Sequence, residues 1–117
     1  ADPGLNALMQ VTLEVNLPET AVFSPIQTNH ILAIVNEALS NAARHAQAHH
    51  VTLWAAQEDG QLQLRITDDG RGLQNQTGGR GLRNMQDRAR ILGGSLTVTS
   101  EPGKGTAVYL SIPLETK

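Results

Sequence analysis

The feature that most limits how this chain can fold is one long segment without glycine or proline. Residues 26–46 are rich in alanine and leucine, and their apolar residues recur at helical spacing. Ser24 lies just before Pro25, a residue favoured at the first helical position, and Gln27 follows three residues after Ser24, which is the pattern of a helix cap. We therefore expect a long amphipathic helix from Ser24 to about Ala46.

Strand patterns precede and follow this helix in the sequence. The residues from Met9 to Val15 alternate between apolar and polar, as in a half-buried strand, and Pro18 ends the pattern. Residues 51–55 and 62–66 predict a hairpin, because Asp-Gly between two such runs is a strong turn signal.

The C-terminal part repeats the order of helix and hairpin. Residues 82–92 have helical spacing, and Gly93-Gly94 closes the segment like a C-terminal cap. Residues 96–98 and 107–112 predict two more strands. This order predicts one α+β domain over residues 1–117, a two-layer sandwich whose mixed, mostly antiparallel sheet has its helices packed on one face.

Composition excludes several functions. The chain has one Phe, one Tyr and one Trp and a formal charge of −2, which argues against binding nucleic acid. It has no cysteine, so disulfides and thiolate metal sites are excluded. No apolar run reaches the length of a membrane span and no signal peptide is visible, so we expect a cytoplasmic domain without direct membrane contact. The first residues lack an initiator Met, and we expect a fragment of a longer protein.

Two glycine-rich turns lie close together in the second half of the chain. The first is Asp68-Asp69-Gly70-Arg71-Gly72, and the second is Gly78-Gly79-Arg80-Gly81-Leu82. Glycine permits positive φ and lacks the Cβ that would keep a ligand away from the backbone. The pattern suggests two pieces of backbone that approach one ligand, although an Asp-Gly turn alone is common between strands.

A polar stripe runs along the long helix. Glu37, Asn41 and Arg44 are spaced at i, i+4 and i+7, which places them on one side of the helix. The stripe fits either a solvent-facing surface or a ligand site, in which an amide oxygen serves Mg²⁺, a carboxylate handles a proton and a cation neutralises phosphate. The apolar residues between them should face the sheet: Ala38, Leu39, Ala42 and Ala43.

These segments resemble the boxes of a known family, the GHKL (Bergerat-fold) ATPases. Residues 36–46 (Asn-Glu-Ala-Leu-Ser-Asn-Ala-Ala-Arg-His-Ala) resemble the N box, most closely that of sensor histidine kinases of the nitrate-sensor and DesK-like subfamily. The segments beginning at Asp68 and Gly79 resemble the two glycine boxes, and Gly103-Lys104-Gly105-Thr106 resembles the closing Gly-x-Gly-Thr. The resemblance spans roughly residues 26–113. It implies the Bergerat fold and favours the ligand-site interpretation of the helix.

The resemblance assigns the adenine of ATP to the first box. It implies that Asp68 accepts a hydrogen bond from the exocyclic amine of adenine and so selects ATP over GTP. Gly70 and Gly72 would let the backbone bend under adenine and ribose, and Thr106 would bind near Asp68. The neighbouring Asp69 is then the better candidate for an ordinary turn cap.

The resemblance assigns the phosphates to the helix and the second box. Asn41 would hold Mg²⁺ that bridges the phosphates, and Glu37 would be the general base or orienting group for phosphoryl transfer. The resemblance also places Arg44, His45, Gly79, Gly81 and Leu82 among the ATP-binding residues. Arg44 would neutralise phosphate charge, and Gly79 and Gly81 would let the phosphates reach the free amides of a helix start, which bind anions.

The chain departs from the family pattern at two places. Residues 73–77 alone separate the glycine boxes, so the lid over the nucleotide is very short. Asn84 occupies a position where relatives often have glycine. None of the four histidines has the setting of a phospho-acceptor, which in this family lies on a separate dimerisation helix.

The resemblance therefore implies the catalytic, ATP-binding domain of a two-component sensor histidine kinase. Such a domain transfers the γ-phosphoryl group of Mg-ATP to a histidine on a dimerisation domain, for later passage to a response regulator. Homodimers would form only through regions missing from this chain. The alternatives are an anti-sigma-factor-type serine kinase of the same fold and a non-catalytic docking module.

Overall fold

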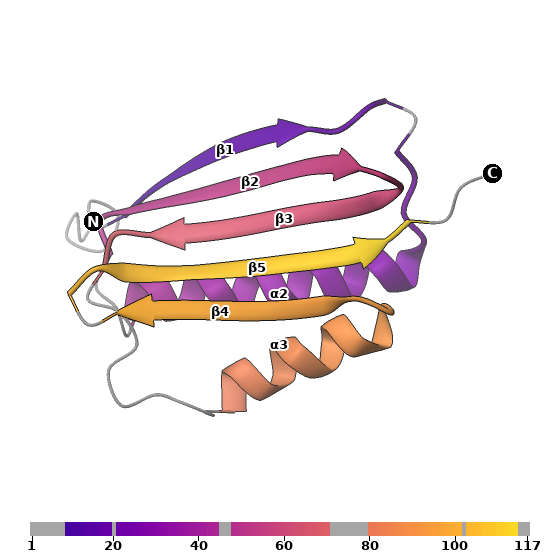
Figure 1. Cartoon of the computed structure of the whole chain (residues 1–117). Helices are drawn as coiled ribbons and strands as arrows, with labels where there is room; N and C mark the ends of the chain where they lie inside the picture. Colours follow the sequence, from indigo (N-terminus) through magenta and orange to yellow (C-terminus); the bar gives the residue numbers. More distant parts are fainter. Residues whose placement is uncertain (1–8, 20, 45–47, 71–79, 102, 115–117) are drawn as a thin grey trace, which may run out of the picture.

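The computed structural model describes residues 9–19, 21–44, 48–70, 80–101 and 103–114. A five-stranded sheet has the order β1-β2-β3-β5-β4, and two helices lie on one side of it (Figure 1). Strands β1 and β2 are parallel and the other neighbours are antiparallel, which confirms the predicted mixed sheet. The elements are β1 (Gln10–Asn16), α2 (Pro25–Arg44), β2 (His50–Glu58), β3 (Gln61–Asp68), α3 (Arg80–Ile91), β4 (Ser95–Glu101) and β5 (Gly105–Pro113).

Helix α2 begins with the predicted cap. The Ser24 Oγ accepts a hydrogen bond from the Gln27 amide at 3.0 Å, and the Gln27 Oε1 accepts one from the Ser24 amide at 2.9 Å. This reciprocal pair satisfies two backbone donors at the helix start. One expectation about the helix is wrong: Ala42 is buried but Ala43 is exposed, because residues one position apart differ by about 100° around a helix.

Local turn signals also fix the hairpin between β2 and β3. Asp59 and Gly60 both have positive φ, 54° and 76°, as a two-residue type I′ turn requires. At the end of α3, the Gly93 amide donates to the Arg90 carbonyl and the Gly94 amide to the Ala89 carbonyl, each at 2.9 Å. Both the hairpin and the C-terminal cap were predicted, and both are confirmed.

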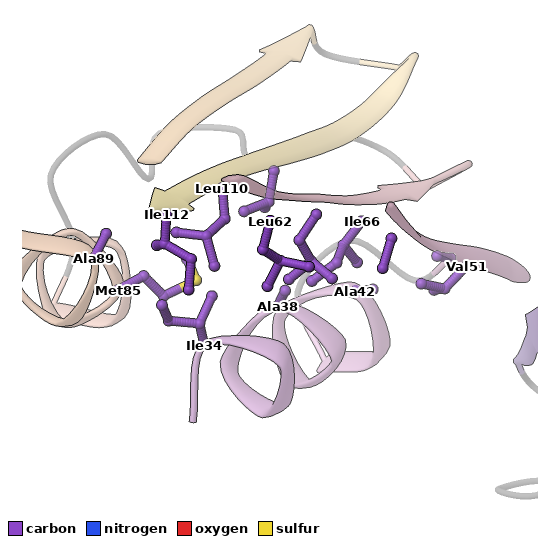
Figure 2. Close-up of a cluster of buried hydrophobic side chains, with 14 residues drawn as sticks. Ile34, Ala38, Ala42, Val51, Leu62, Ile66, Met85, Ala89, Leu110 and Ile112 are labelled. Carbon is purple, nitrogen blue, oxygen red and sulfur yellow. The ribbon is translucent and has the colours of Figure 1, made fainter. Parts of the chain in front are cut away.

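The core lies between the helix-facing side of the sheet and the two helices (Figure 2). Small residues on α2 and α3 allow the helices to pack closely against large aliphatic residues on the strands. The most central contributors are Ile34, Ala38 and Ala42 of α2, Met85 and Ala89 of α3, Leu62, Leu64 and Ile66 of β3, and Val108, Leu110 and Ile112 of β5. Neither α2 nor α3, the helices of the described residues, has the length and apolarity needed to cross a membrane.

Candidate functional site

The candidate site begins where the buried row of β3 ends in a carboxylate. Asp68 is the last residue of β3 and is paired with Val51 on β2 and Thr106 on β5. Because side chains alternate along a strand, Asp68 points to the same face as the buried Leu64 and Ile66. The helix-facing row of β3 is therefore apolar until its last member, which is acidic.

A small cavity lies in front of Asp68. Its volume is about 20 Å³, enough for one water molecule, so a purine ring requires the side chains around it to move apart. The cavity joins α2 and α3 to the ends of three strands. It is lined by Ala38, Asn41, Ile66, Asp68, Leu82, Met85, Val98, Thr106 and Val108.

The Asp68 carboxylate is held by backbone amides. Its Oδ1 accepts a hydrogen bond from the Gly70 amide at 2.8 Å. Burial raises the pKa of Asp68 above its ordinary value, while the amides of Gly70 and Thr106 oppose this shift and the charge of Asp69 adds to it. The expectation that Asp69 makes the turn-capping bond is thus wrong, since Asp68 itself accepts from Gly70.

Asp69 makes its hydrogen bonds elsewhere, to the start of β2 on the surface. Its Oδ1 accepts hydrogen bonds from the amides of His49 at 2.8 Å and His50 at 2.9 Å, and its Oδ2 lies 3.4 Å from the His50 Nδ1. The hydrogen bond from the His50 amide is the main cause of a lowered pKa for Asp69. Asp69 therefore ties the first glycine turn to the start of β2. Both histidines are exposed, as expected.

Gly105 allows β5 to approach β3 closely at the strand end of the site. Its φ is +90°, and a Cβ at this position would overlap the Asp68 carbonyl oxygen. A glycine is needed for both reasons, because other residues are strained at this φ and no side chain fits the space. The close approach of β5 to β3 brings Thr106 beside Asp68, and the Thr106 Oγ1 lies 3.2 Å from the Ser100 Oγ.

The helices form the other half of the site. Asn41 lines the cavity from α2, and Leu82 lines it from α3. Glu37, one turn before Asn41, is half-buried, and its carboxyl group lies against Gly81 in the first turn of α3. Glu37 and Asn41 of the polar stripe therefore face the start of α3 rather than open solvent.

The structure brings together Asn41, Asp68, Leu82 and Thr106 around one cavity, with Gly70 bonded to Asp68. The predicted residues His45, Gly72 and Gly79 and the Arg44 side chain lie outside the described residues, as does the short lid at 73–77. Within the described ranges, no group of three His, Asp or Glu side chains could hold a metal ion.

Sequence reasoning missed the apolar walls of the cavity. Ile66, Met85, Val98 and Val108 lie in segments that were predicted only as strands and a helix, yet they surround the space in front of Asp68. A strand or helix pattern shows that a residue is buried but not whether it is buried against protein or against a ligand space. The signal that could have found them is their position in the rows that end near Asp68 and Thr106.

Comparison with known proteins gives a consistent result. Residues 26–116 match the family described as histidine kinase-, DNA gyrase B-, and HSP90-like ATPase. The sensor histidine kinase LiaS of Bacillus subtilis is 35% identical over 107 residues, which cover 89% of this chain and 29% of LiaS. The nitrate/nitrite sensor protein NarX of Escherichia coli is 38% identical over 110 residues, covering 91% of this chain and 18% of NarX.

A solved structure agrees with the sequence relatives. The histidine kinase domain of the blue-light activated histidine kinase of Erythrobacter litoralis EL346 has a TM-score of 0.74 at 32% identity, covering 89% of this chain and 52% of that one. The chain spans less than a third of the length of LiaS and NarX. Because the family match covers most of its residues, the chain belongs to the histidine kinase-, DNA gyrase B-, and HSP90-like ATPase family.

Proposed function

We propose that this domain binds Mg-ATP and is the catalytic domain of a sensor histidine kinase. The observation that supports this best is the placement of Asp68, a half-buried carboxylate at one end of an apolar cavity. One of its oxygens accepts from Gly70, and a carboxylate has further lone pairs for a ligand donor. Aliphatic walls at Ile66 and Val98 suit the flat faces of a purine.

Base selection follows from the chemistry of Asp68. The exocyclic amine of adenine donates to the carboxylate, whereas guanine presents a carbonyl oxygen at the same position. Two acceptors facing each other in a desolvated pocket leave both without a partner, which is a large penalty. Asp68 should therefore favour ATP over GTP, with Thr106 and the turn at Gly70 and Gly72 completing the adenine side.

The helix half of the site would bind the phosphates. The Asn41 side chain lines the cavity from α2, and its amide oxygen is a suitable hard ligand for Mg²⁺. Arg44, His45, Gly79, Gly81 and Leu82 form the remaining phosphate side of the proposal. Arg44 would neutralise phosphate charge, and the backbone amides at Gly79 and Gly81 would position the phosphate oxygens. Neutralisation and positioning are most of what phosphoryl transfer requires of a protein.

Glu37 would orient or deprotonate the attacking group. The acceptor would be a histidine on a dimerisation domain of the same protein, and a response regulator would receive the phosphoryl group next. The similarity to LiaS, a sensor histidine kinase, and to NarX, a nitrate/nitrite sensor, supports this assignment over a serine kinase.

Calorimetric titration tests the nucleotide part of the proposal. ADP and a non-hydrolysable ATP analogue with Mg²⁺ should bind, and Asp68→Asn should weaken binding by about 100-fold, because the amide presents a donor to the adenine amine or loses the charge that attracts it. The matched control is Asp59→Asn, at the opposite end of β3, where Asn tolerates the positive φ. Absence of binding in the unmodified domain at millimolar nucleotide, or unchanged binding in Asp68→Asn, would contradict the proposal.

A further inference from the structure

A glycine in the first turn of α3 lies directly against a carboxylate of α2. Gly81 is the second residue of α3. A Cβ built on Gly81 would lie 2.8 Å from the Glu37 Cδ and 3.4 Å from its Cγ, and it would be closer still to the Glu37 Oε2. The carboxyl group of Glu37 thus occupies the space that a side chain at position 81 would need.

The backbone conformation does not require glycine at this position. Gly81 is not among the described residues with positive φ, and it lies within a helix, where alanine is strongly preferred. Its lack of a side chain is explained by the space that Glu37 takes.

Electrostatics favours the same contact. The first turn of α3 has no acidic residue of its own, although the free amides of a helix start carry partial positive charge. Glu37 supplies a negative charge to this turn from the neighbouring helix. The packing of Ile34 and Ala38 on α2 with Met85 on α3 holds the two helices in the relation that makes this contact.

We infer that Gly81 is a positioning residue for Glu37. By leaving space in the first turn of α3, it keeps the Glu37 carboxylate between the two helices, one helical turn from Asn41. A side chain at position 81 displaces the carboxylate from the side of the site where the phosphates would lie. The consequence for phosphoryl transfer rests on the proposed function, whereas the contact itself rests on the packing of α2 against α3. This role differs from that of a glycine that only lets phosphates approach the backbone.

A cycle of thermal unfolding measurements without nucleotide tests the inference. In the Glu37→Ala background, Gly81→Ala should raise Tm by about 4 °C, because alanine stabilises the helix and nothing opposes its methyl group. With Glu37 present, the same Gly81→Ala change should raise Tm by clearly less, because the end of the Glu37 side chain must first move out of the space that it occupies. An equal Tm shift in both backgrounds would overturn the inference.

A shorter acid supplies the rescue. Gly81→Ala should raise Tm more in the Glu37→Asp background than in the unmodified domain, since aspartate withdraws its carboxylate by one methylene. ADP affinity gives the second measurement: Gly81→Ala should weaken binding more with Glu37 present than in Glu37→Ala. Equal weakening in both backgrounds would show that Gly81 serves the phosphates directly and would overturn the positioning role. If the unmodified domain does not bind ADP, the proposed function fails while the Tm cycle still decides the positioning role.

Discussion

The two halves of the site are held in place by different interactions. At the strand end, Asp68 and Asp69 are fixed by hydrogen bonds from backbone amides, and Gly105 lets the strands approach. At the helix end, Met85 is fixed by apolar packing, and the Glu37 carboxyl group fits into the space above Gly81.

This difference predicts different sensitivities. Hydrogen bonds to backbone amides depend on the charge and the acceptor atoms of a side chain, so the strand end should respond to isosteric changes such as Asp→Asn. Close packing depends on volume, so the helix end, like the close approach of the strands at Gly105, should respond to the removal or addition of single carbon atoms, whereas the response to Asp→Asn should be confined to the strand end. Each substitution below therefore tests one half of the site against the other.

The largest effect is expected for Gly105→Ala at the strand end. The new Cβ meets the Asp68 carbonyl oxygen, and the φ of +90° is strained for alanine, so the free energy of unfolding should fall by about 3 kcal/mol. Urea unfolding measures this loss. Gly103→Ala is the matched control, since its φ is +82° but its Cβ would have no neighbour within 4 Å. Equal losses in the two variants would mean that backbone strain alone acts and that the close approach of β5 to Asp68 contributes nothing.

At the helix end, Met85→Ala should cost about 2.5 kcal/mol of unfolding free energy, slightly less than Gly105→Ala. Met85 is 3% exposed and its removal leaves a cavity between α2, α3 and the sheet. Urea unfolding again measures the loss, and the exposed neighbour Gln86→Ala serves as control. The hydrogen bonds of Asp68 remain, so nucleotide affinity should fall less than in Asp68→Asn. A larger loss of affinity in Met85→Ala would contradict the division between a polar and a packed half.

Most of the fold could be predicted because its signals are local. The cap at Ser24 and the turn at Asp59-Gly60 each depend on residues within a few positions, and so does the alternation that predicts each strand. The expectation that the first strand is half-buried is wrong, however, because every residue of β1 is exposed in the described part of the chain. Tertiary contacts at the site had no such signal. Asp69 accepts hydrogen bonds from the amides of His49 and His50, which lie 20 and 19 residues earlier in the chain. No residue close to Asp69 in the sequence predicts these two hydrogen bonds.

For the candidate site too, the sequence predicted local features but not the contacts between elements that are distant in the chain. Its polar members, such as Asn41 and Asp68, were found through motifs, but the contact between Glu37 and Gly81 depends on how two helices cross. Spacing along α2 placed Glu37 on a stripe without saying what that stripe faces. The prediction that Ala43 faces the sheet was wrong for a similar reason, because apolar character alone does not determine which side of α2 meets the sheet.

The smallest effect, and the sharpest test of the strand end, is the pH dependence of its two adjacent carboxylates. Asp69 has a lowered pKa, so its contribution to stability is fully present above its ordinary value of 3.8 and is lost as pH falls from there through the folded pKa. Asp69→Asn should remove this acid-dependent loss. Because Asp69 is exposed and screened by solvent, the change at neutral pH should stay below about 1 kcal/mol.

Asp68 should behave in the opposite way. Its pKa is raised, mainly by burial, so its ionised form costs stability above the folded pKa, and this cost disappears as pH falls through that pKa towards 3.8. Asp68→Asn should therefore keep or gain stability at neutral pH, while Asp69→Asn loses some. Urea midpoints measured between pH 3 and pH 7 compare the two variants with the unmodified domain. Parallel pH profiles for both variants would mean that burial and backbone hydrogen bonding do not separate the two carboxylates. If the effects of the two variants change with pH in opposite directions, the domain holds Asp68 ionised despite the cost of burial. A carboxylate that serves a ligand rather than stability would behave in this way.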